Sequence, residues 1–149
     1  MDIIEYFASE NKEHWIKEID KSGWAAAKFL VYLLRENKLK ELTGETARLL
    51  LLTQGDKLVS FCTLAPRDEI DTDEYCPWIG FVFTFEEFRG QRCAGKLLGF
   101  AEKLAKEDGA ENIYISTDHV GLYEKYGYEF MCIMENISGE DCRVYTKKL

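Results

Sequence analysis

A buried strand, a short loop and an amphipathic helix follow one another in the middle of the chain. The strand, Trp78–Thr84, is rich in aromatic and β-branched residues, and the helix is marked by apolar residues that recur at helical spacing from Ala94 to Ala105. Such a unit directs the N–H groups of the loop and of the first helical turn toward one point, where the helix dipole also favours an anion. The unit therefore predicts an anion-binding site within an α/β fold.

Further strands and helices are predicted on both sides of this unit. The first forty residues are expected to be helical, including a mostly apolar segment from Trp24 to about Asn37. Asp118 is expected to cap a short helix that ends near Tyr126. The alternation and turn signals predict strands at Ala47–Thr53, Leu58–Ala65, Ile113–Thr117, Glu129–Glu135 and Arg143–Lys148. The order of elements predicts a mixed α/β sheet.

Composition narrows the class of protein. The 149 residues contain no linker or repeat, so one domain spanning residues 1–149 is expected. A net charge of −8 argues against a nucleic-acid partner. No secretory signal and no long apolar run is visible, so we expect a cytoplasmic protein without a membrane partner. The five cysteines form no C-x-x-C pair, which favours reduced thiols and no metal site.

The loop before the helix matches two phosphate-binding patterns. From Gly90 to Lys96 it is written G-x-x-x-x-G-K, as in loops that bind nucleoside triphosphates. That loop needs a serine or threonine hydroxyl after the lysine to bind magnesium, and this chain has Leu97 there. Only one strand–helix–strand unit is predicted, whereas a nucleotide triphosphatase needs several parallel strands. This interpretation is therefore disfavoured.

The second pattern is R-x-x-R-x-A from Arg89, close to the loop that holds the pyrophosphate of coenzyme A. The small residues Gly90, Ala94 and Gly95 allow a diphosphate to approach the main chain. The segment from residue 85 to residue 96 has three basic and two acidic residues, so it is positive within an acidic chain. This binding mode needs no metal ion, and the sequence favours it.

Two segments resemble motifs of the GNAT superfamily of N-acetyltransferases. Residues 82–98, VFTFEEFRGQRCAGKLL, resemble its central motif, and residues 121–128, GLYEKYGY, resemble its C-terminal motif. The likeness covers roughly residues 47–148, with two departures: Arg92 stands where the family usually has glycine, and the asparagine often found near residues 116–118 is missing. It implies an α/β fold with a mostly antiparallel, twisted sheet flanked by helices, whose central parallel strands splay apart.

The resemblance also implies the reaction and its residues. An acetyl group would pass from acetyl-CoA to a primary amine by direct attack in a ternary complex. Val82 would direct its N–H at the thioester carbonyl, and Tyr123 would protonate the departing thiolate. Tyr123 also fits a purely structural role, because it shares a helical face with Val120 and Tyr126. The residues implied to bind the cofactor are Val82, Phe83, Thr84, Arg89, Gly90, Gln91, Arg92, Ala94, Gly95 and Lys96.

The general base and the acceptor are left open by the sequence. Glu74, Tyr75, Asp118 and His119 are the candidate bases, with relay through water as the alternative. Cys93 is expected to be an inert thiol, although a thiol at a helix N-terminus can also be reactive. The acidic loop after the second predicted strand hints at a cationic acceptor, either a small molecule or a peptide amine. A homodimer is compatible with the resemblance, and a catalytically silent module that binds coenzyme A is the alternative function.

Overall fold

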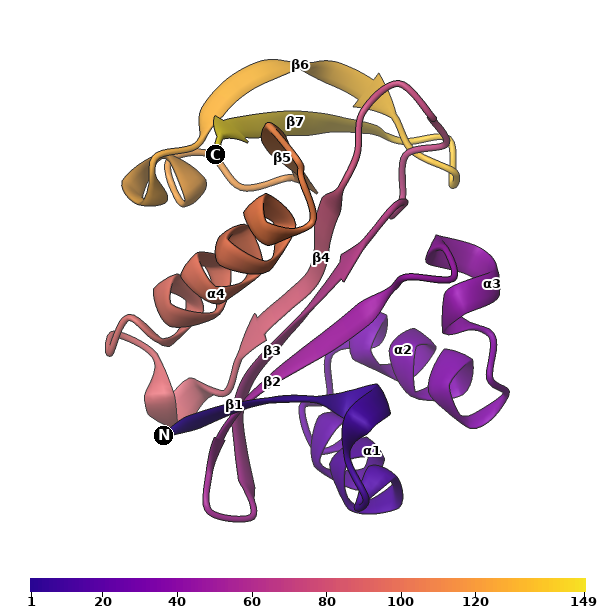
Figure 1. The fold of residues 1–149 in the computed structure, drawn as a ribbon, viewed down its shortest axis with the longest axis vertical. Helices are drawn as coiled ribbons and strands as arrows, with labels where there is room; N and C mark the ends of the chain where they lie inside the picture. Colours follow the sequence, from indigo (N-terminus) through magenta and orange to yellow (C-terminus); the bar gives the residue numbers. More distant parts are fainter.

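One seven-stranded sheet runs through the protein, described here for residues 1–149 from a computed structural model (Figure 1). The strands are β1 (Asp2–Glu5), β2 (Arg48–Gln54), β3 (Lys57–Ala65), β4 (Trp78–Thr84), β5 (Asn112–Thr117), β6 (Glu129–Glu135) and β7 (Asp141–Lys148). They lie in the order β1-β2-β3-β4-β5-β7-β6, and only the neighbours β4 and β5 are parallel. The predicted mixed, mostly antiparallel sheet is confirmed.

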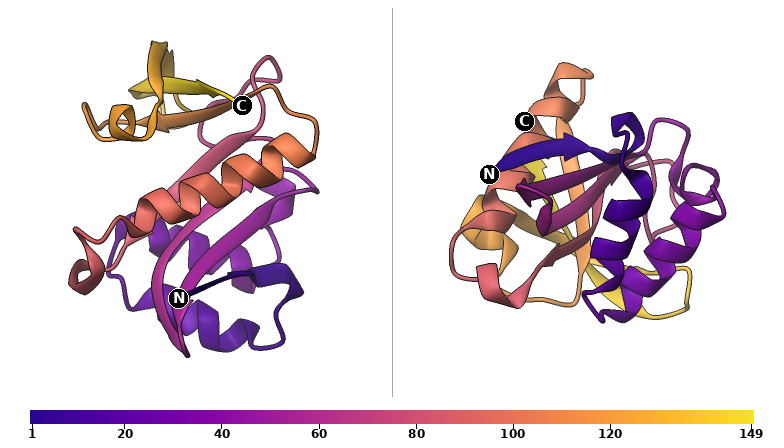
Figure 2. Two further views of the ribbon diagram at one scale, coloured as in Figure 1. Left: turned by 60° about the vertical axis from the view of Figure 1, so that its left-hand side comes forward. Right: turned by 90° about the horizontal axis from the view of Figure 1, so that it is seen from below.

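Helices cover both faces of this sheet. They are α1 (Lys12–Asp20), α2 (Ala25–Arg35), α3 (Leu39–Thr43) and α4 (Cys93–Glu107), joined by the 3₁₀ turns η1 (Tyr6–Ala8), η2 (Glu86–Phe88) and η3 (Tyr123–Tyr126). Figure 2 shows α4 on one face and α1 and α2 on the other. Strand side chains alternate between these layers, so Leu50 and Leu52 join the core under α4 while Leu49 and Leu51 join the core under α1 and α2. No helix combines the length and the apolar character needed to cross a bilayer.

The central strands β4 and β5 pair at only two positions and then separate. The pairs are Trp78 with Tyr114 and Ile79 with Ile115. Just beyond them, β4 carries a bulge against β3, where Phe81 adopts a φ of 50°. A bulge bends its strand and increases the local twist, so the rest of β4 turns away from β5. The predicted splayed pair is confirmed, and it opens the middle of the sheet.

Two sequence-based predictions of secondary structure were wrong. The first forty residues are not all helical, because Asp2–Glu5 forms an edge strand on β2. Four residues are too few to show a period, and their conformation depends on a partner that lies far along the chain. Asp118 does not cap a helix, since only the η3 turn forms, with Leu122 as its N-cap. Gly121, whose φ is +88°, interrupts the helical conformation before that turn.

Candidate active site

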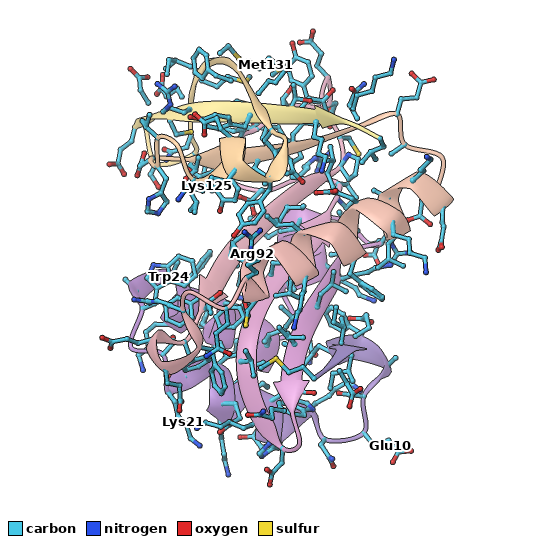
Figure 3. The ribbon with its side chains drawn as sticks, turned by 90° about the vertical axis from the view of Figure 1, so that its left-hand side faces the viewer. Glu10, Lys21, Trp24, Arg92, Lys125 and Met131 are labelled. Atoms are coloured by element: carbon cyan, nitrogen blue, oxygen red, sulfur yellow. The ribbon has the colours of Figure 1, made fainter.

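A cavity of about 1120 Å³ opens where β4 and β5 separate. Its walls come from the start of α2, the loop after β3, strand β4, the loop before α4, the end of β5, the η3 turn and the β6–β7 turn. It is lined by most of the predicted site residues: Val82, Phe83, Thr84, Arg89, Gly90, Arg92, Ala94 and Tyr123. Gln91, Gly95 and Lys96 do not line it. Figure 3 shows the face that carries Trp24, Arg92 and Lys125, which all border the cavity.

The loop before α4 presents a row of unpaired backbone donors. The N–H groups of residues 90–95 donate to no protein acceptor, and the first helical bond runs from Lys96 N to Arg92 O at 3.2 Å. No side chain caps this helix. Six consecutive free donors at the positive end of a helix dipole form a site for an anion. The backbones of Gln91 and Gly95 belong to this row although their side chains lie outside the cavity wall.

The glycines of this loop serve different purposes. Gly90 has a φ of +81° and open space where a Cβ would lie, as expected where a ligand approaches the main chain. At Gly95, by contrast, a Cβ would lie 2.9 Å from the ring of Tyr126. The small size of Gly95 therefore allows the η3 turn to pack against α4, which the sequence did not indicate.

Arginines border the cavity beside these donors. Arg89 donates from Nε to Thr84 O at 3.0 Å and stacks over the ring of Phe83, so it ties the loop to the end of β4. Arg92 is exposed and left-handed, with φ 60° and ψ 29°. Only glycine adopts this conformation without strain, which explains why the related motif usually has glycine here.

The strain at Arg92 leads to a stability prediction. We expect Arg92→Gly to be about 1 kcal/mol more stable than Arg92→Ala, because alanine keeps the left-handed strain and glycine removes it. Both variants lose the same charge, so the comparison isolates the backbone. Urea unfolding at pH 7 measures the difference. Equal stability of the two variants would contradict the assigned conformation.

Tyr123 combines a buried ring with an unpaired hydroxyl. Its ring packs against Tyr128 and Tyr145, with centroids 6.2 and 6.4 Å away, and the residue is 6% exposed. The residue lines the cavity, and its hydroxyl has no hydrogen-bond partner in the protein. Burial, with a smaller contribution from nearby acidic groups, raises the pKa of Tyr123. The hydroxyl therefore stays protonated near neutral pH, as a general acid must.

The candidate bases are divided by the cavity. Asp118 and His119 line it on its exposed rim, whereas Glu74 and Tyr75 lie outside it. The ring of Tyr75 packs against Tyr114 with centroids 5.1 Å apart, which accounts for its position. Cys93 is buried and its thiol lies 3.7 Å from the carbonyl oxygen of Phe88, so its surroundings favour the inert interpretation.

Asp68 is a cavity residue that the sequence did not single out. It lines the wall from the loop after β3, and no side chain pairs with its carboxylate. Burial raises the pKa of Asp68 from 3.8 to about 7. The sequence indicates only an acidic loop at residues 68–74 that hints at a cationic acceptor, and it does not distinguish Asp68 from its neighbours. Ile70, only 1% exposed, is the apolar residue that indicates an anchored segment instead.

The cavity thus has both acidic and basic side chains in its wall. The acidic side chains are those of Asp68, Glu69 and Asp118, and the basic side chains are those of Arg89, Arg92 and Lys125. No group of three or more histidine, cysteine, aspartate or glutamate side chains lies close enough together to hold a metal ion.

Comparisons with known proteins identify the class. The sequence profile of the acetyltransferase (GNAT) family matches residues 5–128. The chain therefore belongs to the GNAT family of acetyltransferases, and its fold carries an acyltransferase site. The nucleoside-triphosphate interpretation of the Gly90–Lys96 loop is wrong. It required several parallel strands joined by crossover helices, whereas the chain belongs to the GNAT family and its sheet contains only one parallel pair of strands.

Solved structures share this fold at low sequence identity. An aminoglycoside 6′-N-acetyltransferase complexed with coenzyme A has a TM-score of 0.72 at 15% identity, covering 99% of this chain and 97% of the other. A GNAT-family acetyltransferase from Staphylococcus aureus has a TM-score of 0.68 at 18% identity, covering 99% and 98%. A GNAT-family acetyltransferase from Elizabethkingia anophelis with acetyl-CoA bound has a TM-score of 0.60 at 21% identity, covering 75% and 82%. No curated protein sequence matches the chain.

Proposed function

We propose that this protein transfers an acetyl group from acetyl-CoA to a primary amine within a ternary complex. The observation that carries the proposal is the row of free N–H donors at residues 90–95, which borders the same cavity as the unpaired hydroxyl of Tyr123. The first feature suits an anionic cofactor and the second suits a proton donor. Two structures of similar fold contain coenzyme A or acetyl-CoA, which supports the choice of cofactor.

Acetyl-CoA would lie along the central unit. Its pyrophosphate would accept hydrogen bonds from the N–H groups of Gly90, Gln91, Arg92, Ala94 and Gly95. The pantetheine arm would enter the gap between β4 and β5, where the backbones of Val82 and Thr84 would hold it, next to Phe83. Arg89 would keep the loop against the end of β4 through its bond to Thr84 O, 3.0 Å long. Lys96 is exposed and would add positive charge near the phosphates.

The residues of the site would then accelerate direct transfer. Holding the amine and the thioester together converts a bimolecular step into an effectively unimolecular one, which is a large part of the available rate gain. The Val82 N–H would stabilise the negative charge that develops on the thioester oxygen. Tyr123 would give its proton to the departing sulfur and regain one from the nitrogen as the amide forms.

Binding of acetyl-CoA provides the first test. Calorimetry should detect acetyl-CoA, and Arg92→Ala should weaken its Kd about tenfold through loss of one phosphate-directed charge. Arg35→Ala is the matched control. Arg35 lies on α2, pairs with Glu13 of α1 at 2.8 Å and does not line the cavity. No heat of binding with millimolar acetyl-CoA would refute the proposed function.

The acceptor is tested by a panel of primary amines with acetyl-CoA. Aminoglycosides belong in that panel because several structures of similar fold are aminoglycoside acetyltransferases. Polyamines, simple alkylamines and peptides with a free N-terminus complete it. Tight acetyl-CoA binding with no acetylated amine in the panel would favour the alternative, a catalytically silent module that binds coenzyme A.

We place this activity in the cytoplasm. All five cysteines are free thiols, which is the usual state in a reducing compartment. Microscopy of a fluorescent fusion, with its integrity checked by immunoblotting, would test the location.

A further inference from the structure

The carboxylate of Asp68 differs from those of its neighbours in having no partner side chain. Arg67 pairs with Asp73 at 2.9 Å, and Glu69 accepts a hydrogen bond from the side chain of Asn136 at 3.0 Å. Asp68 forms neither an ion pair nor a side-chain hydrogen bond, although it lines the cavity. A half-buried carboxylate that faces a cavity without a cationic partner is costly to ionise, and such groups gather at functional sites.

The segment around Asp68 is fixed on both sides. Before it, the N–H of Arg67 donates to Thr43 O at 2.9 Å at the end of α3. After it, the N–H of Ile137 in the β6–β7 turn donates to Glu69 O at 2.8 Å. The next residue, Ile70, packs in a buried cluster with Trp78. The position of Asp68 is therefore set by three separate parts of the fold, as expected for a preorganised group.

Gly80 places the Asp68 carboxylate against the central strand. A methyl group added to Gly80 would overlap the carboxylate of Asp68, and all of its nearest neighbours are atoms of that side chain. The carboxylate thus occupies the space that a larger residue on β4 would fill. Gly80 lies only two residues before Val82 on β4, the strand that would hold the thioester, so the Asp68 carboxylate lies against that part of the strand.

We propose that Asp68 accepts a proton from the ammonium group of a cationic primary amine, the acceptor of the acetyl group. This inference rests on the proposed acetyl transfer and deepens it. The proton moves from nitrogen to the Asp68 carboxylate, and the free amine attacks the thioester carbonyl. The carbon–sulfur bond then breaks, the sulfur takes a proton from Tyr123, and the second nitrogen proton returns to Tyr123. Asp68 finally releases its proton to water, so atoms and charges balance.

The electrostatic surroundings suit a proton acceptor near neutral pH. Burial raises the pKa of Asp68 to about 7, the N–H of Glu69 acts in the opposite direction, and the charge of Glu69 adds to the rise. The other titratable groups of the cavity wall are Cys93, Asp118, His119, Tyr123, Tyr126 and Lys125, together with Arg89 and Arg92. Asp68 is among the groups that raise the pKa of Tyr123. Protonation of Asp68 removes that negative charge and so makes Tyr123 a better acid for the next step.

The titration of Asp68 has a readout that needs no acceptor. Its pKa is about 7 when folded against an ordinary value of 3.8, so the folded state binds this proton more tightly. The free energy of unfolding therefore falls as the pH rises through this interval. Asp68→Asn should unfold at a higher temperature than the wild type at pH 8, and the difference should vanish near pH 4. Asp71→Asn, which changes an exposed aspartate of the same loop, is the control. A flat difference for Asp68→Asn would overturn the proposal.

Two probe amines separate proton transfer from structural damage. Ethylamine is protonated at neutral pH, whereas 2,2,2-trifluoroethylamine is of similar size and is already neutral. Asp68→Asn should lower kcat/KM for ethylamine about 100-fold or more and change that for trifluoroethylamine much less. Acetyl-CoA binding should be unchanged. For the wild type, kcat/KM with ethylamine should decline below about pH 7, where Asp68 is protonated.

Gly80→Ala reaches the same carboxylate by a different route. Its added methyl group should displace Asp68 and reproduce the selective loss of ethylamine acetylation. An equal loss for both amines in Asp68→Asn would refute proton transfer while the acetyl transfer stands. A wild-type enzyme that acetylates neither these two amines nor any other amine in the panel would refute the transfer itself, and the role of Asp68 with it.

Discussion

Replacing Tyr123 by phenylalanine is expected to lower kcat about 100- to 10,000-fold, the range typical for loss of a general acid. The hydroxyl has no protein partner, so its removal should leave the free energy of unfolding nearly unchanged. Because burial raises the pKa of Tyr123, the wild-type rate should not decline on the alkaline side through ionisation of this residue near neutral pH. Steady-state kinetics with the amine found in the panel measures the effect.

The control for this variant is Tyr114→Phe on β5, which also removes a tyrosine hydroxyl but at a residue that does not line the cavity. Its kcat should stay within about twofold of the wild type, as is usual for substitutions away from special features. Calorimetry should give similar acetyl-CoA affinities for both variants. A Tyr123→Phe enzyme with full kcat would restrict Tyr123 to the structural role that its buried ring also fits.

Placing a carboxylate at Ala94 should have opposite effects on stability and on cofactor binding. Ala94 lies in the first turn of α4, where an acidic side chain interacts favourably with the helix dipole, so Ala94→Asp should stabilise the ligand-free protein by about 0.3–1 kcal/mol. The same charge would face the pyrophosphate. Two unit charges about 4 Å apart near a protein surface repel by about 4 kcal/mol, so the Kd of acetyl-CoA should rise at least about 100-fold.

Ala94→Asn separates charge from size in this experiment. It has nearly the same shape as aspartate, and its Kd should rise less than about tenfold if repulsion dominates. Raising the ionic strength should narrow the gap between the two variants, since salt screens exposed charges. Equal losses for both would mean that the side chain blocks the loop by its volume, and unchanged binding by both would place the pyrophosphate elsewhere.

The parts of the fold that the sequence predicted are those specified by neighbouring residues. The unit from Trp78 to Ala105 has a strand period, a loop with glycine and a helix period in direct succession, and the structure contains each of them. Tyr123 and the loop at residues 90–95, which border the same cavity, could be proposed as site residues because both lie in short, contiguous motifs. Local signals of this kind do not need the rest of the chain.

The parts that the sequence missed depend on distant partners. Asp2–Glu5 becomes a strand only because β2 offers it an edge. Asp68 becomes a cavity residue only because Thr43 and Ile137, far from it in the chain, hold its flanking peptides, and because Gly80 leaves room for its carboxylate. Trp24 and Phe81 likewise enter the cavity wall through tertiary contacts. No short-range pattern distinguishes such residues from ordinary surface or core positions.

The separation of β4 from β5 leaves the protein with an interrupted hydrogen-bond ladder. Past Ile79 the strand β4 has no neighbour on that side, and its peptide groups face the cavity in place of another strand. A pantetheine arm carries two amide groups on an extended chain, so under the proposed function it would act as a removable strand that completes the sheet from within. The substrate would then also be a structural component, present during catalysis and lost with each product.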